Sequence, residues 1–180
     1  MNNVARDPDN RYYWRREAVR LESQIVRDSL LALSGTLKPT MGGPSVSPSG
    51  QDGSRRRSIY VKHSLTDRNR FLDTFDEATV LECYRRDQSV RPQQALALSN
   101  SKLVMESSPK IARRISELAP DDNTFIRKAF VAVIGCEASP PEITACAEAL
   151  ESWKKLSNDD EARSHLVWTL LNHSDFITVR

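Results

Sequence analysis

Apolar side chains recur at roughly helical spacing between residues 10 and 34. They are Tyr12, Trp14, Ala18, Leu21, Ile25 and Leu33. Asp9 or Asn10 can cap the start of such a helix, and Gly35 suits the left-handed residue that follows a helix end. The pattern therefore predicts one long helix over residues 10–34.

The segment that follows is rich in residues that interrupt regular structure. Residues 35–53 hold five of the six glycines, together with Pro39, Pro44 and Pro48. This composition predicts a long loop over about residues 35–58, flexible between residues 36 and 57. The β-branched and aromatic content of residues 58–62 is typical of a short extended segment. No strand partner is obvious, so we expect an edge or coil conformation there.

Helical periodicity returns beyond residue 65. The candidate start residues, in chain order, are Thr66 or Asp67, Pro92, Ser108 with Pro109, Asn123 or Thr124, Ser139, and Asp159 or Asp160. Ser139 and Glu142 have the spacing of a capping box, and Gly135 can end the helix before them. The helix from Pro92 should run through Val104. The apolar residues 174–179 should dock on the core.

These elements predict an all-α fold, an irregular helical array in a single domain over residues 1–180. At 180 residues and 39% hydrophobic content, the chain can bury a core without disulfides. Cys83, Cys136 and Cys146 are too widely spaced for a disulfide framework, so we expect small core residues. No apolar run approaches the length of a membrane helix and the first residues lack the apolar centre of a signal peptide, so we expect neither in this chain.

Charge is unevenly distributed along the chain. Residues 1–70 carry 13 Lys and Arg against 7 Asp and Glu, and the remainder carries 13 against 17. A basic first part could favour an acidic partner, but a solvated helix face gives the same count and is the preferred interpretation.

Several stretches, in order along the chain, resemble the planctomycete cytochrome-associated domain of unknown function. They are Asp7-Pro8-Asp9-Asn10-Arg11-Tyr12-Tyr13-Trp14-Arg15, residues 20–35, Met41-Gly42-Gly43-Pro44, Arg56-Arg57-Ser58-Ile59-Tyr60, Phe75-Asp76, Cys83, residues 92–100, and the closing Leu171-Asn172-His173-Ser174-Asp175-Phe176. The structural signature positions are Asp28, Asp76, Arg86, Ser89, Pro92, Gln94 and Asn100. We expect Arg86, Ser89 and Pro92 to fix the turn before a helix, and Asp76 to anchor that turn through hydrogen bonds.

The resemblance implies a place within a larger protein. Members are typically large exported proteins in which this domain is C-terminal and often accompanies a cytochrome-c-like haem domain. This chain resembles the C-terminal portion of the domain. It contains no Cys-x-x-Cys-His haem attachment, so no cofactor is expected in it. Where the family usually has a Gly-Arg-x-Pro turn, this chain has Gly135-Cys136-Glu137-Ala138-Ser139-Pro140, which lacks the arginine.

Arginines are the candidate binding residues. Arg11, Arg15, Arg16, Arg20 and Arg27 could form a row for anions, but Glu17, Glu22 and Asp28 can pair with them at helical spacing. Arg55-Arg56-Arg57, beside a glycine-rich loop and Tyr60, is a better candidate in principle, together with Arg86 and Arg91. The competing interpretation of the three adjacent arginines is a solubilising flank, and it is favoured.

The sequence contains no decisive catalytic pattern. The candidate groups are Asp28, Asp73, Asp76, His63, His165, His173 and the Cys83 thiol. Spacing establishes neither a carboxylate pair nor a nucleophile beside a base. We expect Asp28 and Asp76 to be buried acceptors for arginines or loop N–H groups. Two histidines without a third ligand make a poor zinc site, and no metal is predicted. Met41-Gly42-Gly43-Pro44 lacks the lysine of a phosphate loop and is expected to be a shaped turn.

The preferred function is a non-enzymatic structural or interaction module of a larger exported protein. Its expected partner is the upstream segment of the same domain or another protein. The alternative is a module that binds or helps to process anionic polysaccharide, sulfated or uronic, through the arginines of residues 55–57, 86 and 91. Nucleic-acid binding ranks third.

Overall fold

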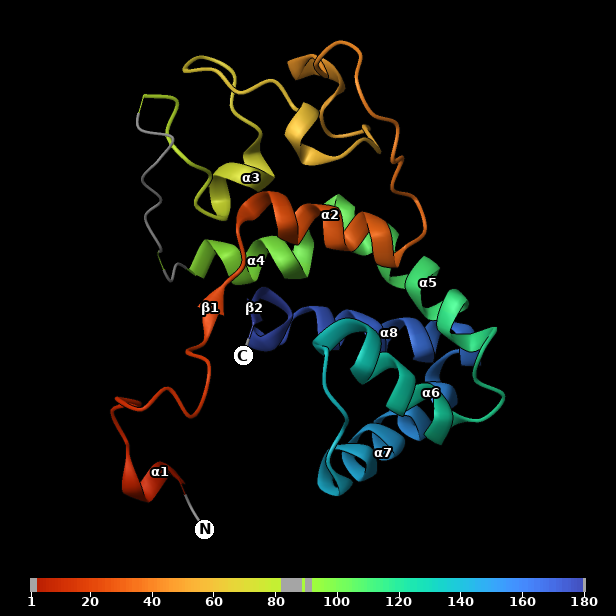
Figure 1. Cartoon of the computed structure of the whole chain (residues 1–180). Helices are drawn as coiled ribbons and strands as arrows, with labels where there is room; N and C mark the ends of the chain where they lie inside the picture. The colour runs from red at the N-terminus through yellow and green to blue at the C-terminus, as the bar shows by residue number, and fades with distance from the viewer. Residues whose placement is uncertain (1–2, 82–88, 90–91, 180) are drawn as a thin grey trace.

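The computed structural model of the chain describes residues 3–81, 89 and 92–179 (Figure 1). Its elements in chain order are α1 (Asn3–Arg6), β1 (Val19–Arg20), α2 (Ser23–Leu33), α3 (Arg70–Thr74), α4 (Pro92–Asn100), α5 (Lys102–Ser116), α6 (Asp122–Ala129), α7 (Pro140–Leu156), α8 (Asp159–Leu171) and β2 (Thr178–Val179). Short 3-10 turns lie at Pro48–Gly50, Ser58–Tyr60 and Ser174–Ile177, and a π-helical turn, Phe130–Ile134, continues α6. The predicted all-α class is confirmed.

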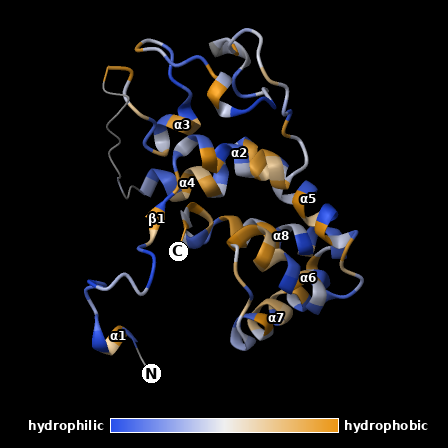
Figure 2. Ribbon diagram, viewed as in Figure 1, coloured by the Kyte–Doolittle hydropathy of each residue, from blue (hydrophilic) through white to orange (hydrophobic). Residues whose placement is uncertain are grey.

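The core is built around α5. This helix packs along α8 on one side and against α2 and α4 on the other, while α6 and α7 complete the lower layer (Figure 1). Val104, Ile111 and Ile115 share one face of α5, because residues seven and eleven apart lie on the same side of a helix. Figure 2 shows hydrophobic stretches along α2, α5 and α8, whereas the segment before β1 is mostly hydrophilic.

The predicted long first helix is wrong over residues 10–22. Only Ser23–Leu33 is α-helical in that range. The Asp7 carboxylate accepts hydrogen bonds from the backbone N–H groups of Arg11 and Tyr12, both at 2.9 Å, and Asn10 and Tyr13 have positive φ angles of 55° and 51°. These local bonds compete with helix formation and close a compact turn instead. The two-residue strand β1 then pairs antiparallel with β2.

The long loop was predicted, but its partners were not. Parallel bridges join Lys38 to Arg56 and Val46 to Val61, so the two halves of the loop lie side by side. The expected extended segment at residues 58–62 instead begins with the 3-10 turn Ser58–Tyr60, which Val61 leaves in extended geometry.

Some predicted helix starts are confirmed and others are shifted. α4 begins at Pro92, and Ser139 with Glu142 forms the capping box of α7, with a 2.7 Å bond from the Ser139 N–H to the Glu142 carboxylate. The observed caps elsewhere are Asn69, Ser101, Asp121 and Asn158, each through its side-chain oxygen. The start predicted at Ser108 with Pro109 is wrong, because Pro109 lies inside α5.

The predictions for Gly135 and for the C-terminal residues agree with the structure. Gly135 has a φ angle of 79° and ends the α6 region in the left-handed conformation. Phe176 and Ile177 are buried, and the Leu21 N–H donates to the Ile177 carbonyl at 2.8 Å. The predicted docking of the C-terminal residues on the core is confirmed.

Candidate functional site

Asp76 joins three segments that are far apart in the sequence. Its carboxylate accepts hydrogen bonds from the Ser89 N–H at 2.8 Å, the Ser89 hydroxyl at 2.6 Å and the Gln94 amide at 3.2 Å. The Arg20 guanidinium, at the end of β1, donates to the Ser89 carbonyl and to the Gln94 side chain. Gln94 is only 2% exposed. The cluster positions the start of α4.

Arg27 and Asp28, adjacent on α2, hold the middle of the long loop. The buried Arg27 guanidinium donates to the Ser54 carbonyl at 2.7 Å, and to the Arg56 carbonyl and the Ser58 hydroxyl at 3.1 Å each. Asp28 accepts from the Ser58 N–H at 2.8 Å and the Ser58 hydroxyl at 2.6 Å. Burial lowers the pKa of Arg27, while the Asp28 charge acts in the opposite direction. Through these hydrogen bonds both residues hold the loop against α2.

The three adjacent arginines do not converge on one point. Arg55 pairs with Glu106 of α5 at 3.1 Å, whereas Arg57 lies 3.7 Å from Asp28 and keeps 58% of its side chain exposed. Two of the three guanidinium groups therefore meet carboxylates of different helices.

Arg56 serves the loop itself. Its guanidinium donates to the Pro44 carbonyl at 2.6 Å and to the Gly42 carbonyl, and it stacks 3.9 Å over the Tyr60 ring. The Tyr60 hydroxyl in turn accepts from the Gly42 N–H at 2.7 Å. Arg86 and Arg91, the other predicted anion ligands, and Cys83 lie outside the described residues.

A hollow of about 630 Å³ with several charged lining residues lies between α2 and the loop. Asp28, Arg57, His63 and Glu77 line it, and His63 Nδ1 lies 3.4 Å from a Glu77 oxygen. Across residues 3–81, 89 and 92–179, no group of three or more His, Cys, Asp or Glu side chains is placed to hold a metal ion.

The remaining titratable candidates are dispersed. His165 contacts the Trp153 ring edge-on with centroids 5.9 Å apart, and His173 Nδ1 accepts from the Asp175 N–H at 3.2 Å. Burial raises the pKa of the Cys146 thiol. The prediction that all cysteines are core residues is wrong for Cys136, which is exposed.

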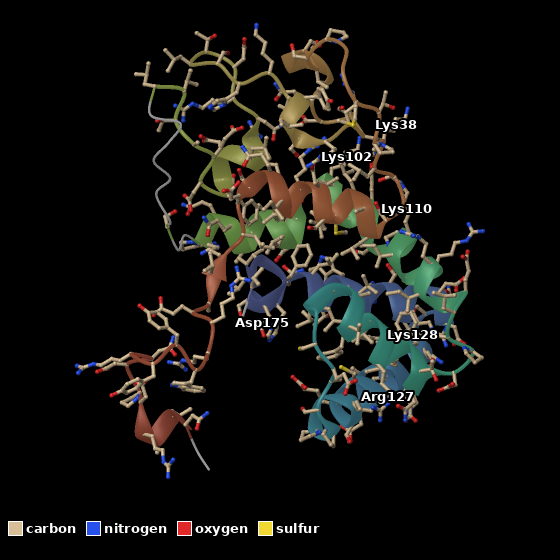
Figure 3. The ribbon with its side chains drawn as sticks, in the orientation of Figure 1. Lys38, Lys102, Lys110, Arg127, Lys128 and Asp175 are labelled. Atoms are coloured by element: carbon tan, nitrogen blue, oxygen red, sulfur yellow. The ribbon has the colours of Figure 1, made fainter. Side chains whose placement is uncertain are left out.

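A second hollow is apolar and reaches α2 only at its C-terminal end, at Ala32 and Leu33. This apolar groove, of about 650 Å³, runs between α5 and α6 with its π-helical turn, and its lining residues are Ala32, Leu33, Ile111, Arg114, Ile115, Leu118, Arg127, Lys128, Val131, Ala132 and Glu137. Figure 3 shows Lys110 on α5 and Arg127 and Lys128 on α6.

Sequence reasoning did not find the apolar groove. Leu118 lies beyond the last helical residue of α5 and is 68% exposed. Val131 is 53% exposed because it lies off the stripe that Ile126, Phe130 and Val133 bury. The one available signal was a larger number of apolar residues in 125–134 than a single helix face can bury.

No helix among the described residues has the length and apolarity needed to cross a membrane. Neither the curated proteins nor the solved structures provide a match. A family model described as PSD1, protein of unknown function (DUF1553), matches residues 1–150. The chain therefore belongs to this family of proteins of unknown function.

Proposed function

We propose that the chain is a non-enzymatic interaction module that binds a segment of another polypeptide in the apolar groove. The observation that carries the proposal is the pair of exposed apolar side chains Leu118 and Val131, on opposite walls of one hollow. Isolated apolar residues on a surface are ordinary, but apolar residues gathered in a groove with a polar rim are typical of a contact site.

The energetics favour an occupied groove. Covering a leucine or valine side chain is worth about 1.5–3 kcal/mol at full burial, and the floor residues Ile111 and Ile115 are already in place beneath them. The walls are helices packed on the core, so the groove needs little reorganisation to receive a partner. A π-helical turn in the wall, Phe130–Ile134, agrees with a functional surface, because such turns are frequent at functional sites.

The polysaccharide alternative has less support. Its central residues, Arg55, Arg56 and Arg57, point at acceptors within the chain, and an incoming sulfate would have to displace them. The larger setting remains part of our proposal: the module acts within an exported protein of planctomycetes, holds no cofactor of its own, and contacts a partner segment from that protein or another.

A selection experiment tests the groove. A displayed library of random segments of about 20 residues, each about 30 Å long as a helix, is selected on the immobilised chain. Enriched segments are then measured against Val131→Asp and Leu118→Asp, with Leu156→Asp as the matched control because Leu156 is exposed on α7 away from the groove.

We expect binding to fall at least about tenfold for both groove variants and to persist for Leu156→Asp, because a carboxylate in the groove must be desolvated. Circular dichroism of each variant checks that it is folded. If no enriched segment distinguishes Val131→Asp from the unchanged chain, the apolar groove is not a polypeptide site and the proposal is wrong.

A further inference from the structure

The rim of the apolar groove is basic. Arg114, Arg127 and Lys128 line it, against the single acidic residue Glu137. Lys110 lies one helical turn before Arg114 on α5 and extends the same row. From this charge distribution and the helical walls we infer that the occupant is an amphipathic helix with acidic residues on both sides of its apolar stripe. This inference rests on the proposed function.

The walls explain why the occupant is a helix. α5 and α6 use their backbone groups in their own hydrogen bonds, so neither wall offers a free strand edge to an extended peptide. A strand laid into an apolar groove would bury N–H and C=O groups without partners, which disfavours an extended guest. A helix brings these bonds with it and buries only side chains.

The fixed position of Arg114 explains why the occupant is acidic. Its guanidinium donates to the Ala32 and Leu33 carbonyls at 2.9 and 2.6 Å, which caps the end of α2 and holds the positive charge at the groove edge. Carboxylates of a guest helix therefore meet a guanidinium group that is already oriented. The Arg114 side chain loses little conformational entropy when they bind.

The opposite wall carries the other charges. Arg127 donates to the Asn123 side chain through Nε and is exposed, and Lys128, also exposed, makes no ion pair with any residue in the described part of the chain. With cations on both walls, acids are favoured on both flanks of the guest stripe, and a helix with basic flanks is repelled.

Two synthetic helical peptides test the inference. Both carry leucine at i, i+3 or i+4, and i+7, with glutamate flanks in one and lysine flanks in the other. Binding is followed by fluorescence anisotropy at low and high salt. We expect the acidic peptide to bind at least about tenfold more tightly, the difference to shrink as salt screens the rim, and a central proline in the peptide to abolish binding.

Charge reversal on the protein completes the test. Lys128→Glu and Arg127→Glu should each lower the affinity for the acidic peptide by about tenfold. Lys155→Glu changes an exposed lysine of α7 outside the groove and should leave that affinity unchanged. Library segments that depend on Val131 but are basic or bind in extended form would overturn the inference and leave the proposed function standing. Absence of any Val131-dependent segment, with neither peptide bound, would overturn both.

Discussion

At the scale of single residues, Asp122 is the charge that binds three helices together. Its carboxylate lies 2.7 Å from the Lys154 ammonium of α7 and 2.9 Å from the Arg163 guanidinium of α8, and Arg163 also donates to the Ser116 hydroxyl of α5 at 3.0 Å. Burial alone would raise the pKa of Asp122, but the hydrogen bonds from Lys154 and Arg163 outweigh it and lower the pKa below its usual value.

Replacing Asp122 by asparagine should destabilise the fold by about 2 kcal/mol, because two charge-assisted bonds are lost and the Arg163 side chain, only 12% exposed, keeps its charge. The free energy of unfolding is measured in urea. Asp160→Asn, on an exposed position of α8, is the matched control and should change stability by less than about 0.5 kcal/mol. Equal losses of unfolding free energy in both variants would show that the Asp122 ion pairs do not stabilise the fold.

The same carboxylate predicts a pH dependence. The unfolded chain has its Asp pKa near about 3.9, and the folded value for Asp122 is lower, so its contribution is complete above the unfolded value and is lost as pH falls through the folded one. The melting temperature of the unchanged chain should therefore fall more steeply than that of Asp122→Asn between about pH 5 and pH 2. Parallel curves would contradict this assignment, since Asp121 and Glu142, whose pKa values are also lowered, are common to both proteins.

Arg27 shows that the importance of a buried arginine can be missed in a charge pattern. Arg27→Met should cost about 3 kcal/mol, because the Ser54 and Arg56 carbonyls lose their donor in a buried site. Hydrogen exchange at the Ser58 amide should accelerate with it. Arg16→Met, at an exposed position, serves as control. A loop whose exchange rates are unchanged would mean that Arg27 does not hold it.

The sequence could predict which residues accept hydrogen bonds better than it could predict their partners. Asp28 and Asp76 were expected to be buried acceptors for arginines or loop N–H groups. Both do accept hydrogen bonds from loop N–H groups, but both are only half-buried. Ser58 lies 30 residues from Asp28, and no local pattern encodes that pairing. Arg27 was placed in an exposed basic row for the same reason, since periodicity describes a helix face but not the loop that covers it.

At the scale of elements, local chemistry decided which boundaries could be predicted. Gly135, the Ser139 capping box and Pro92 act through their own backbone neighbours, and all three predictions hold. The helix prediction for residues 10–22 was wrong because the hydrogen bonds to the Asp7 carboxylate and the pairing of β1 with β2 outweigh a roughly helical spacing. The apolar groove could not be predicted for a different reason, because it forms only where α5 and α6 meet.

At Pro109 the sequence predicts a helix start, whereas the structure has the middle of a helix. Pro109 lies inside α5, where it removes one intrahelical hydrogen bond and its ring crowds the preceding turn. Because its side chain is exposed, Pro109→Ala should raise the free energy of unfolding by about 2–3 kcal/mol. Chemical denaturation measures the change, with Lys110→Ala, the exposed neighbour, as control. A loss of stability would mean that the proline geometry is required by the packing of α5 on α8.

At the scale of the whole molecule, the C-terminal residues are joined to the segment that directly precedes α2. β2 pairs with β1, and the turn Ser174–Ile177 buries Phe176 and Ile177 against the core that α2 and α8 share. Neither strand could be predicted from its own residues, because two-residue strands carry no periodic signal and are stable only where the surrounding core holds them. The C-terminal residues therefore fix the position of the segment that precedes α2.

Phe176→Ala tests this coupling. A phenylalanine that is 4% exposed leaves a cavity when truncated, so the fold should lose about 3–5 kcal/mol. Because the Leu21 N–H bonds to the neighbouring Ile177 carbonyl, amide exchange at Leu21 should rise more than the global loss alone requires. Tyr12→Ala, at a side chain 84% exposed, should change stability by less than about 0.5 kcal/mol. If Phe176→Ala destabilises the fold but Leu21 exchanges only through global unfolding, the segment before α2 and the C-terminal residues are held independently, and the pairing of β1 with β2 follows from the core instead of reinforcing it.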